Sequence, residues 1–326
     1  MFHTNGLELH AALEGTGDNL VIFLHGFPQC WYVWRHQIRF LAKEGYRVCA
    51  PDQRGYGKSD CPRGVEDYDI LKLAADVVGL ADELGAERFA VVGQDWGCTV
   101  AWNVALLYPH RVWGVFGFSV PYVPRLLRNW TNPSQYEDSF WYVRYFMQPG
   151  VAEAELEADI TRTLMWIWHS ACAGTDTHML DLFQGGPKDR KFLDGLGPTP
   201  TTVPGYSQAD LDYSLGLFRQ SGFRGPLNWY RNLPRQRELT PWLEDARILA
   251  PAMFAYGDDD TTTRRTKDFD RSLANAPVHE QDQYFENLMG KAIVPGSGHW
   301  PMIENPHFVN SLLLNFLYSV SPWPKK

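Results

Sequence analysis

The residues with the clearest chemistry are Gly93-Gln94-Asp95-Trp96-Gly97, which follow an apolar run at 89–92 and precede a helix-like stretch at 96–107. Small residues on both sides of a nucleophile allow a sharp strand-to-helix turn that lifts the central side chain clear of the sheet. A carboxylate in that place attacks an sp³ carbon and forms an alkyl ester, whereas a serine would attack a carbonyl. Asp95 therefore indicates ring opening or carbon–halogen cleavage, unless it merely caps the helix that follows.

Two later strand ends carry residues that could complete a catalytic triad with Asp95. The first is Asp258-Asp259-Asp260, after an apolar run that ends at Gly257, and the second is His299, after a run at 292–295. Nucleophile, then acid, then histidine is the chain order of the α/β-hydrolase fold, in which the acid orients the histidine. We predict Asp260 as the acid from its distance to Gly257, with its two neighbours as alternatives. His299 is predicted as the base, with a plain turn residue as the alternative.

A loop near the N-terminus could supply an oxyanion hole. His25-Gly26-Phe27-Pro28 ends the apolar run at 20–24. A glycine there lets the backbone approach a ligand closely. The amides of Phe27 and Trp96 could then point at one oxygen, unless the loop is a simple strand-ending turn.

The elements that position these residues alternate between strand and helix. An edge strand is expected at 7–13, and buried strands at 20–24, 47–50, 89–92 and 112–120. Helices are expected at 31–43, at 70–84 after an Asp69 cap, and from Asn305 onward. Such alternation predicts an α/β fold with a mostly parallel sheet covered on both faces and ligands bound at the carboxyl ends of its strands. Together with the chain order of nucleophile, acid and histidine, it predicts the α/β-hydrolase fold.

The segment from 121 to 240 differs from the rest because it is dense in aromatic residues. Helix-like stretches at 153–170 and 208–220 flank a segment rich in glycine and proline at 185–205, which we interpret as a long surface loop. We predict a core domain of residues 1–120 and 241–326, with 121–240 inserted as a helical cap. The cleft between them should be apolar.

Composition restricts the partners. The chain has 326 residues and a net charge of −8 without a basic cluster, which argues against nucleic acid or an anionic membrane surface as partner. Long apolar segments and a signal-peptide pattern are lacking, so we expect a soluble, cytoplasmic protein. Its five scattered cysteines indicate free thiols. Neither a metal nor a cofactor is expected, and the oligomeric state stays open, with a homodimer as one alternative.

Several motifs together resemble an epoxide hydrolase of the α/β-hydrolase superfamily, over nearly the whole chain. The two cap segments are the most specific part. Gln94 departs from the family, which more often has histidine there, and Cys98 replaces a usual glycine or alanine; both changes leave the chemistry intact. The motifs are 25–28, Trp31-Tyr32-Val33-Trp34-Arg35, 52–59, 93–97, 257–260, 298–300 and, in the cap, 142–153 and 224–231.

The resemblance implies a two-step reaction with a small hydrophobic epoxide and water. Asp95 attacks an epoxide carbon while Tyr142 and Tyr230 hydrogen-bond the epoxide oxygen and donate a proton. His299, oriented by Asp260, then activates water to hydrolyse the ester, and the product is a vicinal diol. Without the resemblance, the two tyrosines could equally be core residues. The predicted substrate contacts are Trp34, Trp96, Trp141, Phe146, Trp229 and Trp300.

Two other functions are compatible with parts of the pattern. A haloalkane or haloacid dehalogenase uses the same Asp–His–Asp triad, and Trp96 could stabilise a departing halide. Phe27 lacks the side-chain donor expected there, and a dehalogenase needs no pair of tyrosines. A non-catalytic binder on the same fold would be expected to have lost the nucleophile, the acid or the base, and all three are present.

Overall fold

The central element is a mostly parallel sheet. The computed structural model describes residues 1–122, 137–176, 179–243, 245–263 and 280–322. In these residues seven strands lie in the order β11-β10-β7-β6-β4-β5-β3, with β3 antiparallel to β5 and the other neighbours parallel. The strands are β3 (Ala11–Glu14), β4 (Leu20–Leu24), β5 (Arg47–Pro51), β6 (Phe89–Gln94), β7 (Val112–Phe118), β10 (Ala252–Gly257) and β11 (Leu288–Val294).

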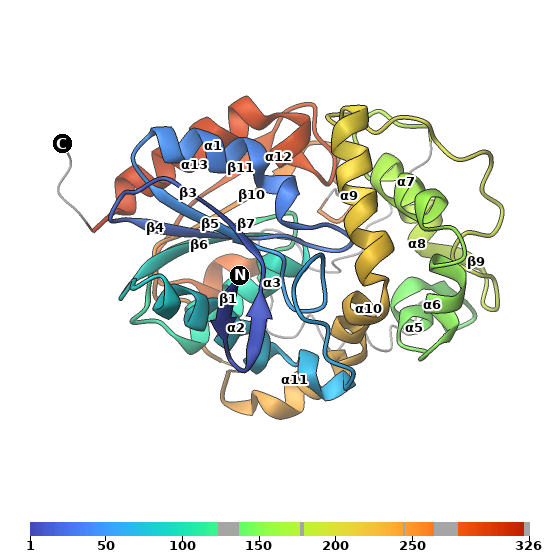
Figure 1. Ribbon diagram of the computed structural model, residues 1–326, viewed down its shortest axis with the longest axis horizontal. Helices are drawn as coiled ribbons and strands as arrows, with labels where there is room; N and C mark the ends of the chain where they lie inside the picture. The colour runs from blue at the N-terminus through green and yellow to red at the C-terminus, as the bar shows by residue number, and fades with distance from the viewer. Residues whose placement is uncertain (123–136, 177–178, 244, 264–279, 323–326) are drawn as a thin grey trace.

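Helices cover both faces of this sheet. Every residue of β4, β6 and β7 is buried, as expected for apolar strands covered on two sides. Figure 1 shows α1 and α13 on one face and α2 and α3 on the other. The covering helices are α1 (Arg35–Lys43), α2 (Ile70–Glu83), α3 (Trp96–Leu107), α12 (Pro301–Glu304) and α13 (Pro306–Val320).

The helix starts follow local capping chemistry. The Asp69 carboxylate accepts a hydrogen bond from the Lys72 amide at the start of α2, as predicted. Asn305 caps α13 in the same way, with Pro306 in the first turn. The helix expected at 31–43 begins as a 3₁₀ turn, η1 (Trp31–Trp34), and becomes α1 at Arg35.

Three sequence expectations are wrong in detail. Residues 7–13 are two strands: β2 (Leu7–Leu9), which pairs with β1 (Phe2–Thr4), and then β3. Residues 153–170 are two helices because Asp159 leaves the helical conformation, with φ −145°, and its side chain caps the second helix. The expected loop at 185–205 begins with β9 (Gln184–Pro187), which pairs with β8 (Ser139–Trp141).

A second group of helices lies together beyond one side of the sheet (Figure 1). This group contacts the loops that follow β4 and β5: the Trp168 indole N–H donates to the Pro28 carbonyl at 2.9 Å, and the Trp229 indole N–H donates to the Arg54 carbonyl at 3.1 Å. Residues 123–136 of the predicted cap lie outside the described residues. The group comprises α5 (Tyr142–Phe146), α6 (Val151–Leu156), α7 (Ile160–Ser170), α8 (Met179–Phe183), α9 (Gln208–Ser221) and α10 (Arg224–Arg231). The next helix, α11 (Leu233–Leu239), lies apart from them at the lower edge of Figure 1.

Within the described ranges, no helix combines the length and the apolar content that a bilayer crossing requires.

Candidate active site

Asp95 occupies the sharp turn between β6 and α3. Its backbone has φ 54° and ψ −122°, a conformation that non-glycine residues rarely adopt and that costs about 1–3 kcal/mol. A Cβ atom at Gly93 would lie 2.2 Å from the Gly97 carbonyl oxygen, and one at Gly97 would lie 2.1 Å from the Leu24 carbonyl oxygen. Both glycines are therefore required for the turn.

The Asp95 carboxylate points away from the helix that it precedes. Among the described residues it caps no amide of α3, so the helix-cap alternative is wrong. Its Oδ1 instead accepts a hydrogen bond from the Phe27 amide at 2.9 Å. A Cβ at Gly26 would lie 2.4 Å from the Asp95 Cβ, which explains why this loop needs a glycine. Trp96, the other predicted oxyanion residue, is the first residue of α3.

His299 lies between two carboxylates. Its Nδ1 is 3.1 Å from Asp260 Oδ1, and its Nε2 is 3.5 Å from Asp95 Oδ2. His299 and Asp260 are both buried. The amide and the hydroxyl of Thr262 donate to the same Asp260 oxygen, at 2.9 and 2.7 Å, and so fix the orientation of the acid.

The three adjacent aspartates have different partners. Asp260 is the one that hydrogen-bonds His299. The Asp258 carboxylate accepts from the amides of Gly296 and Ser297, and Asp259 Oδ2 accepts from the Gly174 amide. The geometry thus favours Asp260 over both alternatives.

The two carboxylates change the charge state of His299. Burial by itself would lower the pKa of the imidazole, but the charge and hydrogen bond of Asp260, together with those of Asp95, raise it to about 10. The resting side chain is therefore an imidazolium at neutral pH. Its positive charge compensates the two buried or half-buried carboxylates.

Tyr142 and Tyr230 come from different helices, α5 and α10, and their rings lie close together. Their ring centroids are 5.8 Å apart, and both side chains are buried. The Tyr230 ring also lies 5.3 Å from the Phe27 ring and 5.1 Å from the Trp96 ring. Burial raises the pKa of the Tyr230 phenol well above its usual value, and the nearby Tyr142 and Asp95 act in the same direction. Tyr230 is therefore a proton donor, never a phenolate, at rest.

Five of the six predicted aromatic contacts lie next to these groups. Phe146 packs on both tyrosines, 5.4 Å from Tyr142 and 5.2 Å from Tyr230. Trp141 lies 4.9 Å from Tyr142. The other three are Trp96 beside Tyr230, Trp229 at 5.7 Å from Trp96, and Trp300 at 4.6 Å from His299.

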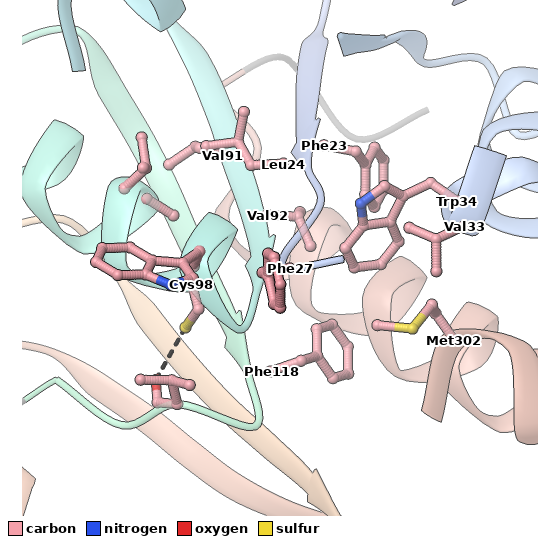
Figure 2. Packing of buried hydrophobic residues seen from close by; sticks show 14 of the residues in the cluster. Phe23, Leu24, Phe27, Val33, Trp34, Val91, Val92, Cys98, Phe118 and Met302 are labelled. Carbon is pink, nitrogen blue, oxygen red and sulfur yellow. Dashed lines mark hydrogen bonds between the residues drawn. The ribbon is translucent and has the colours of Figure 1, made fainter. Parts of the chain in front are cut away.

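Trp34 lies elsewhere in the core. Its ring packs 4.8 Å from Phe23 on β4 and 6.1 Å from Phe118 on β7. Figure 2 shows it among these buried side chains, and its side chain has no exposed surface. These contacts of Trp34 are those of a core residue.

Two aromatic residues near the site were not assigned from the sequence. Phe183 lies 4.6 Å from Tyr142, and Phe192 lies 5.1 Å from Phe146. Phe183 belongs to the aromatic-rich segment, which was the available signal. Phe192 lies in the segment interpreted as a surface loop. The glycines and prolines of that segment favour an exposed loop, so they gave no indication that Phe192 is buried.

Comparisons with known proteins show the family of this chain. Residues 19–306 match the model of the α/β hydrolase fold family. Epoxide hydrolase A of Mycobacterium tuberculosis is 41% identical over 320 residues, which cover 96% of this chain and 95% of that protein. Epoxide hydrolase 3 of Siraitia grosvenorii is 36% identical over 328 residues, which cover 97% of this chain and 96% of that protein.

Solved structures give the same result. The crystal structure of epoxide hydrolase A from Mycobacterium thermoresistibile has a TM-score of 0.86 at 41% identity and covers 98% of this chain and 97% of its own. Potato (Solanum tuberosum) epoxide hydrolase I has a TM-score of 0.81 at 28% identity, with 98% of both chains covered. The dehalogenase alternative is not favoured by these matches. In sequence and in fold, over nearly its whole length, this chain belongs to the epoxide hydrolases of the α/β-hydrolase superfamily.

Proposed function

We propose that this protein converts epoxides to vicinal diols through a covalent ester on Asp95. The observation that carries the proposal is a pair of buried tyrosine rings with centroids 5.8 Å apart, one of which, Tyr230, is close enough to Asp95 in its nucleophile turn to be affected by its charge. A carboxylate can open an epoxide, and the ring oxygen then needs a proton. Asp95 would provide the carboxylate that opens the ring, and the two phenols would provide the proton for the ring oxygen.

The first half-reaction forms the ester. Asp95 Oδ2 attacks an epoxide carbon, the carbon–oxygen bond breaks, and a tyrosine hydroxyl gives its proton to the departing oxygen. Esterification removes the negative charge of Asp95, which is one of the two charges that raise the pKa of His299. The imidazolium proton then becomes available to the phenolate, and His299 becomes neutral.

The second half-reaction hydrolyses the ester. Neutral His299 takes a proton from water as the water oxygen adds to the ester carbon, and Asp260 stabilises the imidazolium that forms. The Phe27 amide, which donates to Asp95 Oδ1 at 2.9 Å, and the Trp96 amide stabilise the oxyanion. Collapse transfers the His299 proton to the diol oxygen and leaves a water oxygen on Asp95.

We further propose that residues 121–240 act as the cap that brings the tyrosines to this site. Its aromatic side chains Phe146 and Phe183 pack against the two tyrosines, and such apolar surroundings suit a small hydrophobic epoxide. Tyr142 and Tyr230 both belong to this segment, whereas Asp95, Asp260 and His299 belong to the core strands' ends. The substrate-contact roles of the neighbouring aromatic residues are part of the same proposal.

The test compares two substrates. The enzyme is incubated with an aromatic terminal epoxide and, separately, with a bromoalkane, and the products are quantified by chromatography and bromide assay. The proposal predicts diol from the first and no bromide from the second. Bromide release without diol would support the dehalogenase alternative, because a halide needs no proton donor.

A further inference from the structure

We propose that Glu304 is a positioning residue for His299: its carboxylate fixes the loop that carries the base and links that loop to the chain segment after α7. This inference rests on the proposed function, since it assigns Glu304 to the hydrolytic half-reaction alone. Glu304 is the last residue of α12, and the sequence pattern gave it no role.

The carboxylate of Glu304 binds the amides on both sides of His299. The Gly298 amide lies 3.1 Å from Oε1 and 3.0 Å from Oε2, and the Trp300 amide lies 3.1 Å from Oε1. The Ala173 amide donates to Oε2 at 2.8 Å. One side chain therefore connects the residues before and after the base to the end of α7.

The amide and carbonyl of His299 itself have other partners. Its amide donates to the Ala171 carbonyl at 2.7 Å. Its carbonyl accepts from the Gln94 side-chain amide at 3.0 Å. A Cβ at Gly298 would lie 2.3 Å from the Ala171 oxygen, so the two segments are in direct backbone contact. The backbone on both sides of the imidazole is therefore held by hydrogen bonds, and Glu304 accepts those from the two flanking amides, of Gly298 and Trp300.

Backbone amides are the donors to Glu304, which makes an acid-to-amide substitution informative. A glutamine has one accepting oxygen, and its NH₂ group would face N–H donors instead of accepting from them. Burial raises the pKa of Glu304, while the hydrogen bonds from Ala173, Gly298 and Trp300 lower it. Loss of these bonds would release the loop on both sides of the base without touching the imidazole.

The two half-reactions should respond differently. Asp95 is positioned by its own turn and by the Phe27 amide, neither of which contacts Glu304, and alkylation needs no base. Water activation depends on the position of His299 to a fraction of an ångström, and a displacement of about 1 Å can cost roughly a hundredfold in rate. Glu304→Gln should therefore slow ester hydrolysis and spare ester formation.

The experiment is single-turnover quench flow with the aromatic epoxide, followed by intact-protein mass spectrometry. The proteins compared are the parent, Glu304→Gln, Glu304→Asp and His299→Gln. The matched control is Glu286→Gln, a half-exposed acid that pairs with Arg247. Thermal unfolding and near-ultraviolet circular dichroism are recorded for each protein.

We expect Glu304→Gln to form the ester within about twofold of the parent rate and to hydrolyse it roughly 10- to 100-fold more slowly. His299→Gln should accumulate the ester, Glu304→Asp should recover part of the hydrolysis, and Glu286→Gln should match the parent. If Glu304→Gln does not fold, the rates of ester formation and ester hydrolysis in Glu304→Asp are compared with those of the parent instead. A smaller loss, again confined to hydrolysis, is then expected.

Hydrolysis at the parent rate in Glu304→Gln, or equal slowing of both half-reactions, would overturn the inference while leaving the proposed function intact. A parent enzyme that forms neither ester nor diol would instead overturn the proposed function, and this inference with it.

Discussion

His299 is held between the carboxylates of Asp95 and Asp260, at 3.5 and 3.1 Å. This arrangement raises the pKa of its imidazole to about 10, although burial alone would lower it. A base with so high a pKa is already protonated at neutral pH. Formation of the proposed ester removes the negative charge of Asp95, which is one of the two charges that raise the pKa of His299. The pKa of His299 should therefore fall during turnover, so that the imidazole can act as a base.

Asp95→Asn should therefore lower the pKa of His299. The raised value stabilises the folded state fully below the unfolded pKa of about 6.5, and this stabilisation is lost as the pH rises through about 10. In Asp95→Asn the loss should be complete at a lower pH and smaller in total, since Asp260 alone remains to raise the folded pKa. Imidazole NMR titration measures the pKa, with His299→Gln to assign the signal. An unchanged pKa would mean that Asp95 has no influence on the base.

Tyr142→Phe and Tyr230→Phe should each slow formation of the Asp95 ester. An alkoxide is far more basic than a phenolate, and removal of one stabilising donor costs on the order of 3 kcal/mol, roughly a hundredfold in rate. The double change should abolish almost all activity, because groups that act together are not additive. Stopped-flow tryptophan fluorescence measures the rates. Near-parental ring opening by the double variant would make both tyrosines simple core residues.

At the scale of elements, α10 is docked closely on the core. A Cβ at Gly225 would lie 2.5 Å from the Gly55 carbonyl oxygen, so the two backbones are in contact. The Trp229 indole N–H donates to the Arg54 carbonyl at 3.1 Å, and Arg224 donates to the Pro62 carbonyl at 3.0 Å. This helix carries Tyr230, whose position is therefore set by the loop that follows β5.

Gly225→Ala should displace α10 and with it Tyr230. Ester formation should slow by roughly 10- to 100-fold, because a displacement of about 1 Å is enough to misalign the donor. The control is Gly216→Ala on α9, where a Cβ would meet nothing within 4 Å and alanine should stabilise the helix by up to about 1 kcal/mol. Stopped-flow rates and thermal unfolding distinguish the two. Parental ester formation in Gly225→Ala would show that α10 tolerates the shift.

Helices and strands were predictable where the spacing of apolar residues and the capping residues indicate the same element. The strands at 20–24 and 89–92 and the helix after Asp69 have the predicted positions, because burial and local chemistry favour the same structure. The break at Asp159 was not predicted, because a helical pattern of apolar residues continues through it and the cap is visible only in the backbone angles.

At the scale of the whole molecule, the site gathers residues that are far apart in sequence. Phe27, Asp95, Asp260 and His299 all follow strands of one sheet, and the carboxyl ends of parallel strands lie at one edge. Chain order and glycine spacing were therefore sufficient to predict them. Tyr142 and Tyr230 were assigned by resemblance, since no local signal distinguishes a tyrosine in a site from one in a core.

Glu304 and the core position of Trp34 could not be derived in the same way. Glu304 acts on backbone amides, which every residue has, so its partners leave no trace in the sequence. Trp34 belongs to a family motif, but a motif does not specify which face of η1 packs against the sheet. Both depend on tertiary packing.

In the proposed mechanism Asp95 forms an ester and supplies one oxygen to the diol. A single turnover with enzyme in excess in heavy-oxygen water, followed by mass spectrometry of the diol and of the peptide that contains Asp95, measures where the water oxygen goes. We expect an unlabelled diol and one heavy oxygen on Asp95, because water attacks the ester carbon. A diol that carries solvent oxygen in the first turnover, with Asp95 unlabelled, would rule out the ester.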